Sequence, residues 1–168
     1  MSTPEYIASA LDESDPVESF TCGNPALDDW LHDSAKRMQK AGTVRTTVLR
    51  RTDDETLAGY YAICPTEIRR DEHALSSRVR GAVSRVPGFM LAKLAVASAA
   101  QGQGLGRDLL IDALENICEA ADLAGGRIIV VDPIDEAAAG FYARHGFTSV
   151  EGTARMYILV EDARASLW

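Results

Sequence analysis

The sequence predicts an α/β fold, and two observations support that prediction. The first is a short apolar segment without glycine or proline, Met90–Val96, which a glycine-rich stretch and then a strongly periodic helix follow. The second is Ile128–Val131, an apolar segment typical of a buried strand. Because a helix separates these two segments, we expect them to lie parallel, as in a right-handed crossover.

Length and composition favour one domain spanning residues 1–168, which is large enough to bury a substantial core. No apolar run approaches the roughly 20 residues that cross a bilayer, and the first residues lack the features of a signal peptide. The cysteines Cys22, Cys64 and Cys118 are few and far apart, which suits a reducing compartment. We therefore expect a cytoplasmic protein without a membrane partner.

The N-terminal third predicts a strand and a helix. Residues 4–11 form a weak first strand. Asn24 is suited to cap a helix with Pro25 at its first position, and Gly42 is a natural stop. One face of this single helix would be apolar, with Leu27, Trp30, Leu31, Ala35 and Met38.

The middle of the chain predicts a hairpin and a long connection. Thr43–Arg51 and Leu57–Cys64 are rich in β-branched, aromatic and apolar residues, and a polar turn joins them. Pro65–Gly88 is polar and is expected to be irregular. A connection of this length inside a compact domain is usually functional, so we expect it to border the acceptor site.

The C-terminal half predicts helices alternating with strands. Apolar residues recur at helical spacing after the glycines, and Gly125–Gly126 ends this helix. Asp135 begins a second helix, and Met156–Val160 supplies the last strand.

The glycine-rich stretch is a candidate anion site. A helix that follows it presents unpaired N–H groups and a positive dipole end, and small residues allow a phosphate to approach the backbone. We therefore consider a pyrophosphate site, with an ordinary glycine-rich connection as the alternative.

The spacing of this stretch resembles a known signature. Gln101-Gly102-Gln103-Gly104-Leu105-Gly106 fits Gln/Arg-x-x-Gly-x-Gly/Ala, the coenzyme A motif of the GCN5-related N-acetyltransferase (GNAT) family. Residues 135–147 resemble that family's later motif, a helix with a tyrosine that ends in Gly-Phe. The resemblance implies a mixed, mostly antiparallel central sheet that splays at the cofactor site and has flanking helices.

The resemblance also implies acetyl-CoA as co-substrate and a set of residues that bind it. The end of the first central strand would pair with the pantetheine arm, and main-chain N–H groups of the loop would hold the pyrophosphate. The implied cofactor-binding residues are Leu94, Ala95, Val96, Gln101, Gly102, Gln103, Gly104, Leu105, Gly106, Arg107, Asp135 and Phe141. Asp135 departs from the asparagine often found at that helix start.

Tyr142 is the expected general acid in direct acyl transfer. A phenol of pKa roughly 10 stays protonated at neutral pH and can protonate the leaving thiolate. The alternative is a core tyrosine with a satisfied hydroxyl. No general base is evident, since His145 lies three residues after Tyr142 and is expected to point away. No metal is expected, because Asp28 and His32 lack a third ligand.

Further segments resemble a narrower group, the TacT-like acetyltransferase toxins of bacterial toxin–antitoxin pairs. They include Phe20–Gly23, Leu27–Leu31, Gly59–Ala62 and Leu91–Val96. That resemblance implies acetylation of the α-amine of aminoacyl-tRNA, a homodimer, and neutralisation by a ribbon-helix-helix antitoxin. The group usually has arginine where this chain has Lys93, and the two side chains bind phosphate differently.

The charge distribution is compatible with a tRNA partner. The net charge is −8, yet residues 34–93 contain 12 of the 17 basic residues and 6 of the 25 acidic ones. This segregation permits a basic face, although scattered surface charges would give the same counts. The candidate tRNA or acceptor residues are Lys36, Arg37, Lys40, Arg45, Arg78, Arg80, Arg85 and Lys93.

Two other functions fit the same sequence. One is an ordinary GNAT enzyme acting on a small amine, a peptide N-terminus or a lysine, for which an acidic protein is well suited. The other is a non-catalytic module that binds coenzyme A, although Tyr142 argues against it.

Overall fold

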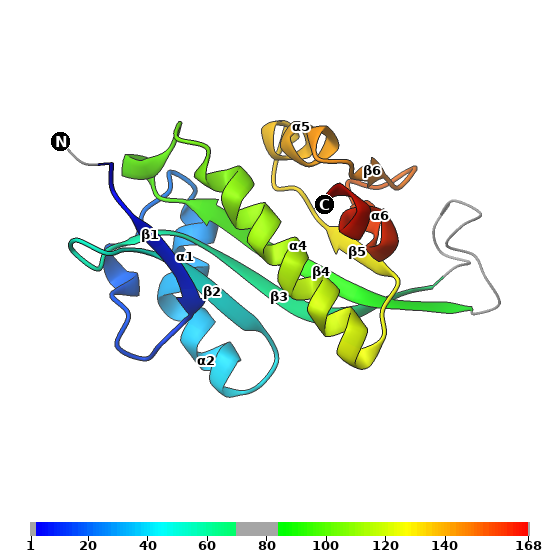
Figure 1. Ribbon diagram of the computed structural model, residues 1–168, viewed down its shortest axis with the longest axis horizontal. Coiled ribbons are helices and arrows are strands. Elements are labelled where there is room, and N and C mark those ends of the chain that lie inside the picture. Colours follow the sequence, from blue (N-terminus) through cyan, green and yellow to red (C-terminus); the bar gives the residue numbers. More distant parts are fainter. Residues whose placement is uncertain (1–2, 70–83, 168) are drawn as a thin grey trace. The chain divides into compact units, whose positions relative to one another are not determined.

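The computed structural model describes residues 3–69 and 84–167, which form two compact units (Figure 1). Of the described residues, one unit comprises 3–64 and 93–113, and the other comprises 65–69, 84–92 and 114–167. Among the described strands the hydrogen-bonded order is β1-β2-β3-β4-β5-β7-β6, and β3 and β4 contribute to both units. The expected mixed α/β sheet is therefore confirmed.

The strands of the first unit are antiparallel. β1 (Tyr6–Ala10) pairs with β2 (Arg45–Arg51), which pairs in turn with the start of β3 (Leu57–Arg69). A bulge between Leu49 and Arg50 shifts the second register by one residue. This arrangement confirms the hairpin predicted from the β-branched and aromatic segments.

Helices α1 (Pro25–Asp33) and α2 (Ala35–Lys40) follow the N-terminal strand. The Asn24 side chain accepts from two N–H groups of the first turn, as its position before Pro25 predicted. The prediction of one continuous helix was wrong, because Ser34 leaves helical geometry with φ −120° and ψ −35°. Hydrogen bonds on both sides of Ser34 maintain the path of the chain, so one apolar face still extends to Ala35.

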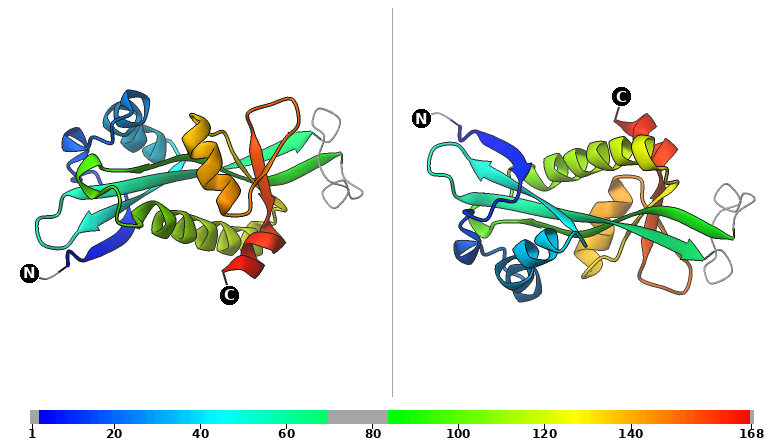
Figure 2. Two further views of the ribbon diagram at one scale, coloured as in Figure 1. Left: turned by 90° about the horizontal axis from the view of Figure 1, so that it is seen from above. Right: turned by 90° about the horizontal axis from the view of Figure 1, so that it is seen from below.

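Two adjacent tyrosines of β3 show which helix packs on each face of this unit. Successive side chains of a strand point to opposite faces. The Tyr60 hydroxyl donates to the Leu27 carbonyl of α1 at 2.8 Å, and the Tyr61 hydroxyl donates to Asp112 of α4 at 2.5 Å. Helices α1 and α2 therefore cover one face and the first half of α4 covers the other (Figure 2).

The second unit contains the parallel crossover. Strands β4 (Arg85–Val96) and β5 (Ile128–Val131) are parallel, and α4 (Leu105–Ala124) connects them as predicted. β7 (Met156–Leu159) is antiparallel to β5, and the short β6 (Thr148–Ser149) is antiparallel to β7. The four residues of β5 are all buried, which explains their continuous apolar character.

The expectation that Pro65–Gly88 is irregular was wrong at both ends. β3 continues to Arg69 and β4 begins at Arg85, and the strand residues Ile68 and Val86 are buried. Pro65 and Pro87 are both exposed within these strands. Proline is uncommon inside strands, so the sequence pattern around these residues did not predict extended structure. Residues 70–83 lie outside the described part of the chain.

The C-terminal segment has two helices. α5 (Glu136–Arg144) begins after its cap Asp135, as predicted. The predicted last strand ends one residue early, because Val160 begins α6 (Val160–Ser166), a helix that the sequence pattern did not suggest. Arg164 of α6 forms an ion pair with Asp122 of α4 at 2.9 Å, and the two helices lie side by side in Figures 1 and 2. Within the described residues, none of the helices combines the length and apolar character that a bilayer crossing requires.

Candidate active site

The glycine loop begins where β4 ends. A short 3₁₀ turn, Ser98–Ala100, follows the strand and leads to Gln101. Gly102 and Gly104 have φ values of +82° and +81°, a conformation that favours glycine. A Cβ atom added at either position would meet nothing within 4 Å. The loop therefore needs glycine for its backbone conformation, and open space lies on the side where a ligand would approach.

Helix α4 begins directly after this loop. The N–H of Asp108 donates to the Gly104 carbonyl at 3.2 Å, which is the first bond of the helical ladder. The N–H groups of Leu105, Gly106 and Arg107 precede that bond, so helix geometry gives them no acceptor within the helix. They lie at the positive dipole end of a 20-residue helix. These features suit a bound diphosphate, so the residues present fit the expected cofactor.

The side chain of Gln101 does not extend along the loop. Its Nε2 donates to the Val96 carbonyl at 3.0 Å and to the Cys22 carbonyl at 2.9 Å. Gln103 differs, because its Oε1 accepts a bond of 3.4 Å from the Tyr6 hydroxyl. Of the two glutamines of the motif, only Gln101 thus bonds through its side chain to main-chain carbonyls among the described residues.

The end of β4 extends beyond its pairing with β5. The paired residues of β4 are Gly88–Met90, whereas the strand continues to Val96. Ala95 is buried against the α1 side, and Leu94 and Val96 are partly exposed. The backbone of residues 94–96 therefore lies beyond the register with β5, and the Val96 carbonyl there accepts from Gln101 Nε2. Gly59 allows the close packing here, since a Cβ on it would lie 2.9 Å from the Ala95 carbonyl oxygen.

Tyr142 lies on α5 in the second unit, with its ring between two other aromatic rings. The ring centroids of Phe141 and Phe147 are each 5.3 Å from that of Tyr142. Tyr142 is 7% exposed, and burial raises the pKa of its phenol to about 12. Among the described residues, no hydrogen-bond partner of the Tyr142 hydroxyl is found. The ring is thus packed between Phe141 and Phe147 in a buried position.

Asp135 and His145 mark the two ends of α5. Asp135 Oδ1 accepts the Ala138 N–H at 2.8 Å, so the carboxylate caps the helix as expected for its position. His145 Nδ1 lies 2.8 Å from the Phe141 carbonyl oxygen. A carbonyl only accepts, so Nδ1 carries the proton. The imidazole also contacts the Phe141 ring, tilted by 52° with 4.6 Å between the centroids.

The candidate basic residues differ in their exposure and in whether their charged groups bond to other parts of the protein. Lys36 donates to the carbonyls of Glu13 and Asp15 at 2.7 and 2.8 Å, so it supports the N-terminal loop. Lys93 is half-buried, with its Nζ 5.8 Å from the centroid of the Trp30 ring. Arg85 is exposed and 3.4 Å from Glu67.

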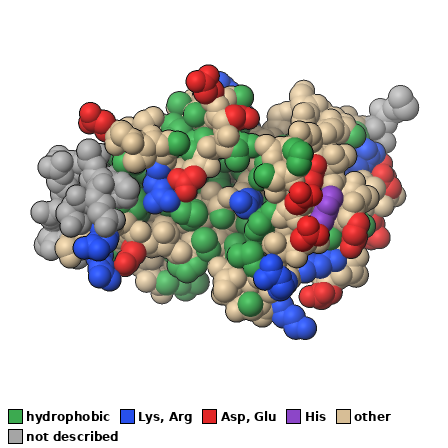
Figure 3. All heavy atoms as spheres, turned by 180° about the vertical axis from the view of Figure 1, so that it is seen from behind, with side chains coloured by type: hydrophobic (Ala, Val, Ile, Leu, Met, Phe, Trp, Pro, Cys, Tyr) green, Lys and Arg blue, Asp and Glu red, His purple; other side chains and the backbone are tan. Residues whose placement is uncertain are grey.

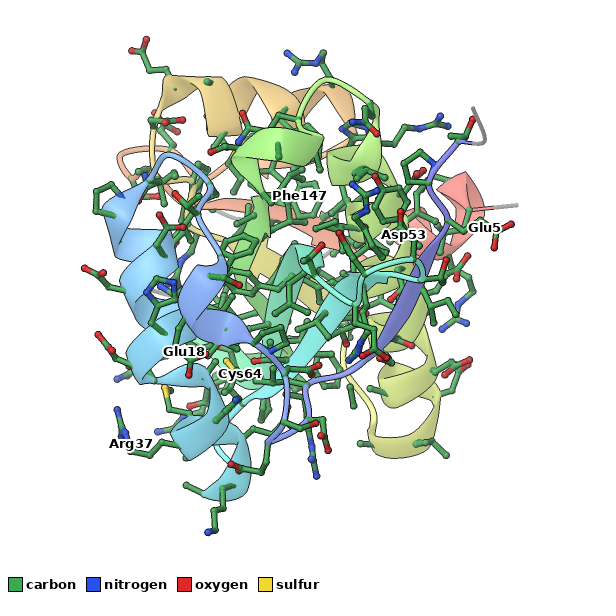
Figure 4. All side chains as sticks on the ribbon, turned by 90° about the vertical axis from the view of Figure 1, so that its left-hand side faces the viewer. Glu5, Glu18, Arg37, Asp53, Cys64 and Phe147 are labelled. Carbon is green, nitrogen blue, oxygen red and sulfur yellow. The ribbon has the colours of Figure 1, made fainter. Side chains whose placement is uncertain are left out.

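Three further basic residues of the first unit are exposed: Arg37, Lys40 and Arg45. Figure 4 shows Arg37 pointing away from α2. Arg78 and Arg80 lie outside the described residues. On the face shown in Figure 3, lysine and arginine side chains lie among acidic ones. Among the described candidates, Arg37, Lys40, Arg45 and Arg85 are therefore exposed, whereas Lys36 and Lys93 are partly buried.

Asp28 and His32 have structural roles. The Asp28 carboxylate accepts from the Cys22 N–H at 2.9 Å, and His32 Nε2 lies 2.8 Å from the Phe20 carbonyl oxygen. Both side chains therefore hold the segment before α1, a role that their spacing alone did not reveal. Within residues 3–69 and 84–167, no group of three or more potential metal ligands is close enough to hold an ion.

Comparison with known proteins identifies the family. The family profile described as acetyltransferase (GNAT) domain matches residues 44–149. This range includes β2 to β6 and the whole of the glycine loop and α5. The chain therefore belongs to the GNAT acetyltransferase family, and the predicted fold and enzyme class are confirmed.

Individual relatives indicate a narrower group. The chain is 34% identical over 156 residues to the tRNA-acetylating toxin of Mycobacterium tuberculosis (strain ATCC 25618 / H37Rv), covering 92% of each chain. It is 27% identical over 156 residues to the probable toxin TacT of Sinorhizobium fredii (strain NBRC 101917 / NGR234), covering 88% of this chain and 86% of the relative. The solved structure of AtaT complexed with acetyl-methionyl-tRNAfMet has the same fold, with a TM-score of 0.87, 24% identity and coverage of 96% and 98%.

Proposed function

We propose that this protein transfers the acetyl group of acetyl-CoA to the α-amine of an aminoacyl group on tRNA, and so acts as a toxin that blocks translation. The assignment of aminoacyl-tRNA as the acceptor rests on the 34% identity to a tRNA-acetylating toxin, which extends over 92% of both chains. The resemblance to the TacT-like toxins supports a homodimer and a ribbon-helix-helix antitoxin as partners, in the cytoplasm.

The main-chain groups of the first unit supply cofactor binding in this proposal. The N–H groups of Gly102–Arg107 hold the diphosphate, and the backbone of Leu94, Ala95 and Val96 aligns the pantetheine arm. Backbone donors of this kind need no rearrangement as charge develops, and a backbone N–H near Val96 would stabilise the oxyanion. Bound acetyl-CoA supplies the activated acyl group.

Tyr142 supplies the proton for the leaving thiolate. Its raised pKa keeps the phenol protonated throughout the neutral range, and the rings of Phe141 and Phe147 fix its ring. The acceptor is an α-amine of pKa roughly 7.7–8.0, so solvent can deprotonate it without a dedicated protein base.

Mass spectrometry of a mixed pool of aminoacyl-tRNAs, after incubation with acetyl-CoA, tests the acceptor class. The proposal predicts an acetyl group on the α-amine of one or a few aminoacyl-tRNAs, and none on uncharged tRNA. Incubation of the same enzyme with lysine, polyamines and short peptides is the control. Acetylation of those amines without any product on aminoacyl-tRNA would instead indicate an ordinary GNAT enzyme.

A further inference from the structure

The segment Phe20–Gly23 lies against the turn that follows β4. The N–H of Ser98 donates to the Thr21 carbonyl at 2.8 Å. Gln101 Nε2 donates to the next carbonyl of the same segment, that of Cys22, at 2.9 Å. Two bonds thus attach this segment to the residues that immediately precede Gly102.

Gln101 joins this segment to the end of β4 as well. Its amide nitrogen carries two hydrogens, and both have acceptors, the carbonyls of Cys22 and Val96. One side chain therefore fixes three points of the backbone: the end of β4, the Phe20–Gly23 segment, and the start of the glycine loop.

The Phe20–Gly23 segment is fixed on its other side by α1. His32 bonds to the Phe20 carbonyl, and the Asp28 carboxylate accepts from the Cys22 N–H and, at 3.3 Å, from the Thr21 hydroxyl. Hydrogen bonds therefore run continuously from α1 through this segment to Gln101. All of these residues belong to the first unit.

We propose that Gln101 is a positioning residue that holds the glycine loop in its binding conformation by fixing the loop's first residue to Val96 and Cys22. This inference rests on the proposed binding of coenzyme A at the loop. The two donors reduce the conformational freedom that the loop would otherwise lose on binding a diphosphate. The motif allows glutamine or arginine at this position, and both side chains present more than one N–H to neighbouring carbonyls.

Replacement of Gln101 by methionine and by arginine tests this role. Gln101→Met keeps a similar length without charge or donors, whereas Gln101→Arg keeps the donors. Loss of two hydrogen bonds predicts that the methionine variant binds coenzyme A about tenfold or more weakly in calorimetry, with a similar rise in the KM for acetyl-CoA. We expect kcat at saturating acetyl-CoA to change less than KM. The arginine variant should remain within about threefold of the wild type.

Asp28→Ala provides a second test through the same chain of bonds. Asp28 lies on α1 and bonds to Cys22 and Thr21 rather than to the glycine loop. We nevertheless expect its replacement to weaken coenzyme A binding, as Gln101→Met does. Because both substitutions release the Phe20–Gly23 segment, the double variant should lose less affinity than the sum of the single losses. Strict additivity would contradict a shared element.

Two results would overturn the inference. One is wild-type coenzyme A affinity in Gln101→Met. The other is an equal loss of affinity in the methionine and arginine variants, which would show that the donors do not matter. Calorimetry with coenzyme A needs no acceptor, so a failure to acetylate aminoacyl-tRNA would reject the proposed function and leave this result unaffected.

Discussion

Gly104→Ala, with Gly42→Ala as its matched control, separates the binding role of the glycine loop from the cost of its backbone conformation. The two glycines have nearly the same φ, +81° and +79°, and an added Cβ would meet nothing within 4 Å at either position. Each alanine should therefore cost about 1 kcal/mol of folding free energy, because a left-handed residue with a Cβ is strained. For a chain of this size that cost lowers Tm by about 2–4 °C.

Only Gly104→Ala is expected to weaken coenzyme A binding. Its methyl group would occupy the open side of the loop and separate at least one N–H donor from the diphosphate. A hydrogen bond to a charged group contributes about 1.5–3 kcal/mol, so affinity should fall roughly ten- to a hundredfold. Isothermal calorimetry of both variants with coenzyme A, after their Tm values are compared, measures the difference. Equal affinities in the two variants would refute the assignment of the loop.

Three other predictions address catalysis and the acceptor. Tyr142→Phe should lower kcat by about a hundredfold or more, while the calorimetric affinity for acetyl-CoA is retained; unchanged kcat would remove Tyr142 from the mechanism. Because burial raises the pKa of Tyr142 to about 12, kcat/KM should rise with deprotonation of the acceptor amine, pKa roughly 8, and then stay level to about pH 10. A loss of activity between those values would contradict a protonated tyrosine of raised pKa. If tRNA binds through phosphate contacts, its affinity should fall steeply with salt, and Arg45→Ala should reduce that slope; a flat salt response would argue for a small-molecule acceptor.

Much of the fold was predictable because its main signals are local. The cap Asn24, the hairpin and the periodic helix α4 each depend on residues within about one element. The errors arose where tertiary packing decides the outcome. The polar character of Pro65–Gly88 predicted an irregular connection, yet β3 continues to Arg69 with Ile68 buried. No local signal marked the interruption at Ser34.

The candidate site was predictable to a similar degree. The glycine spacing indicated the loop, and the Phe-Tyr pattern indicated an aromatic helix, because both motifs are contiguous in sequence. The orientation of the Gln101 side chain was not predictable, since its acceptor Cys22 is 79 residues away. The same holds for Lys36, whose Nζ donates to the carbonyls of Glu13 and Asp15, residues more than 20 positions away.

The claim that main-chain N–H groups bind the diphosphate is tested most directly by NMR. Backbone amide resonances of isotope-labelled protein would be followed as coenzyme A is added, and again with pantetheine, which lacks the diphosphate. We predict large downfield shifts at the amides of Gly102–Arg107 with coenzyme A only, and none at Gly42. Binding of coenzyme A that leaves the Gly102–Arg107 amides unshifted would contradict the account.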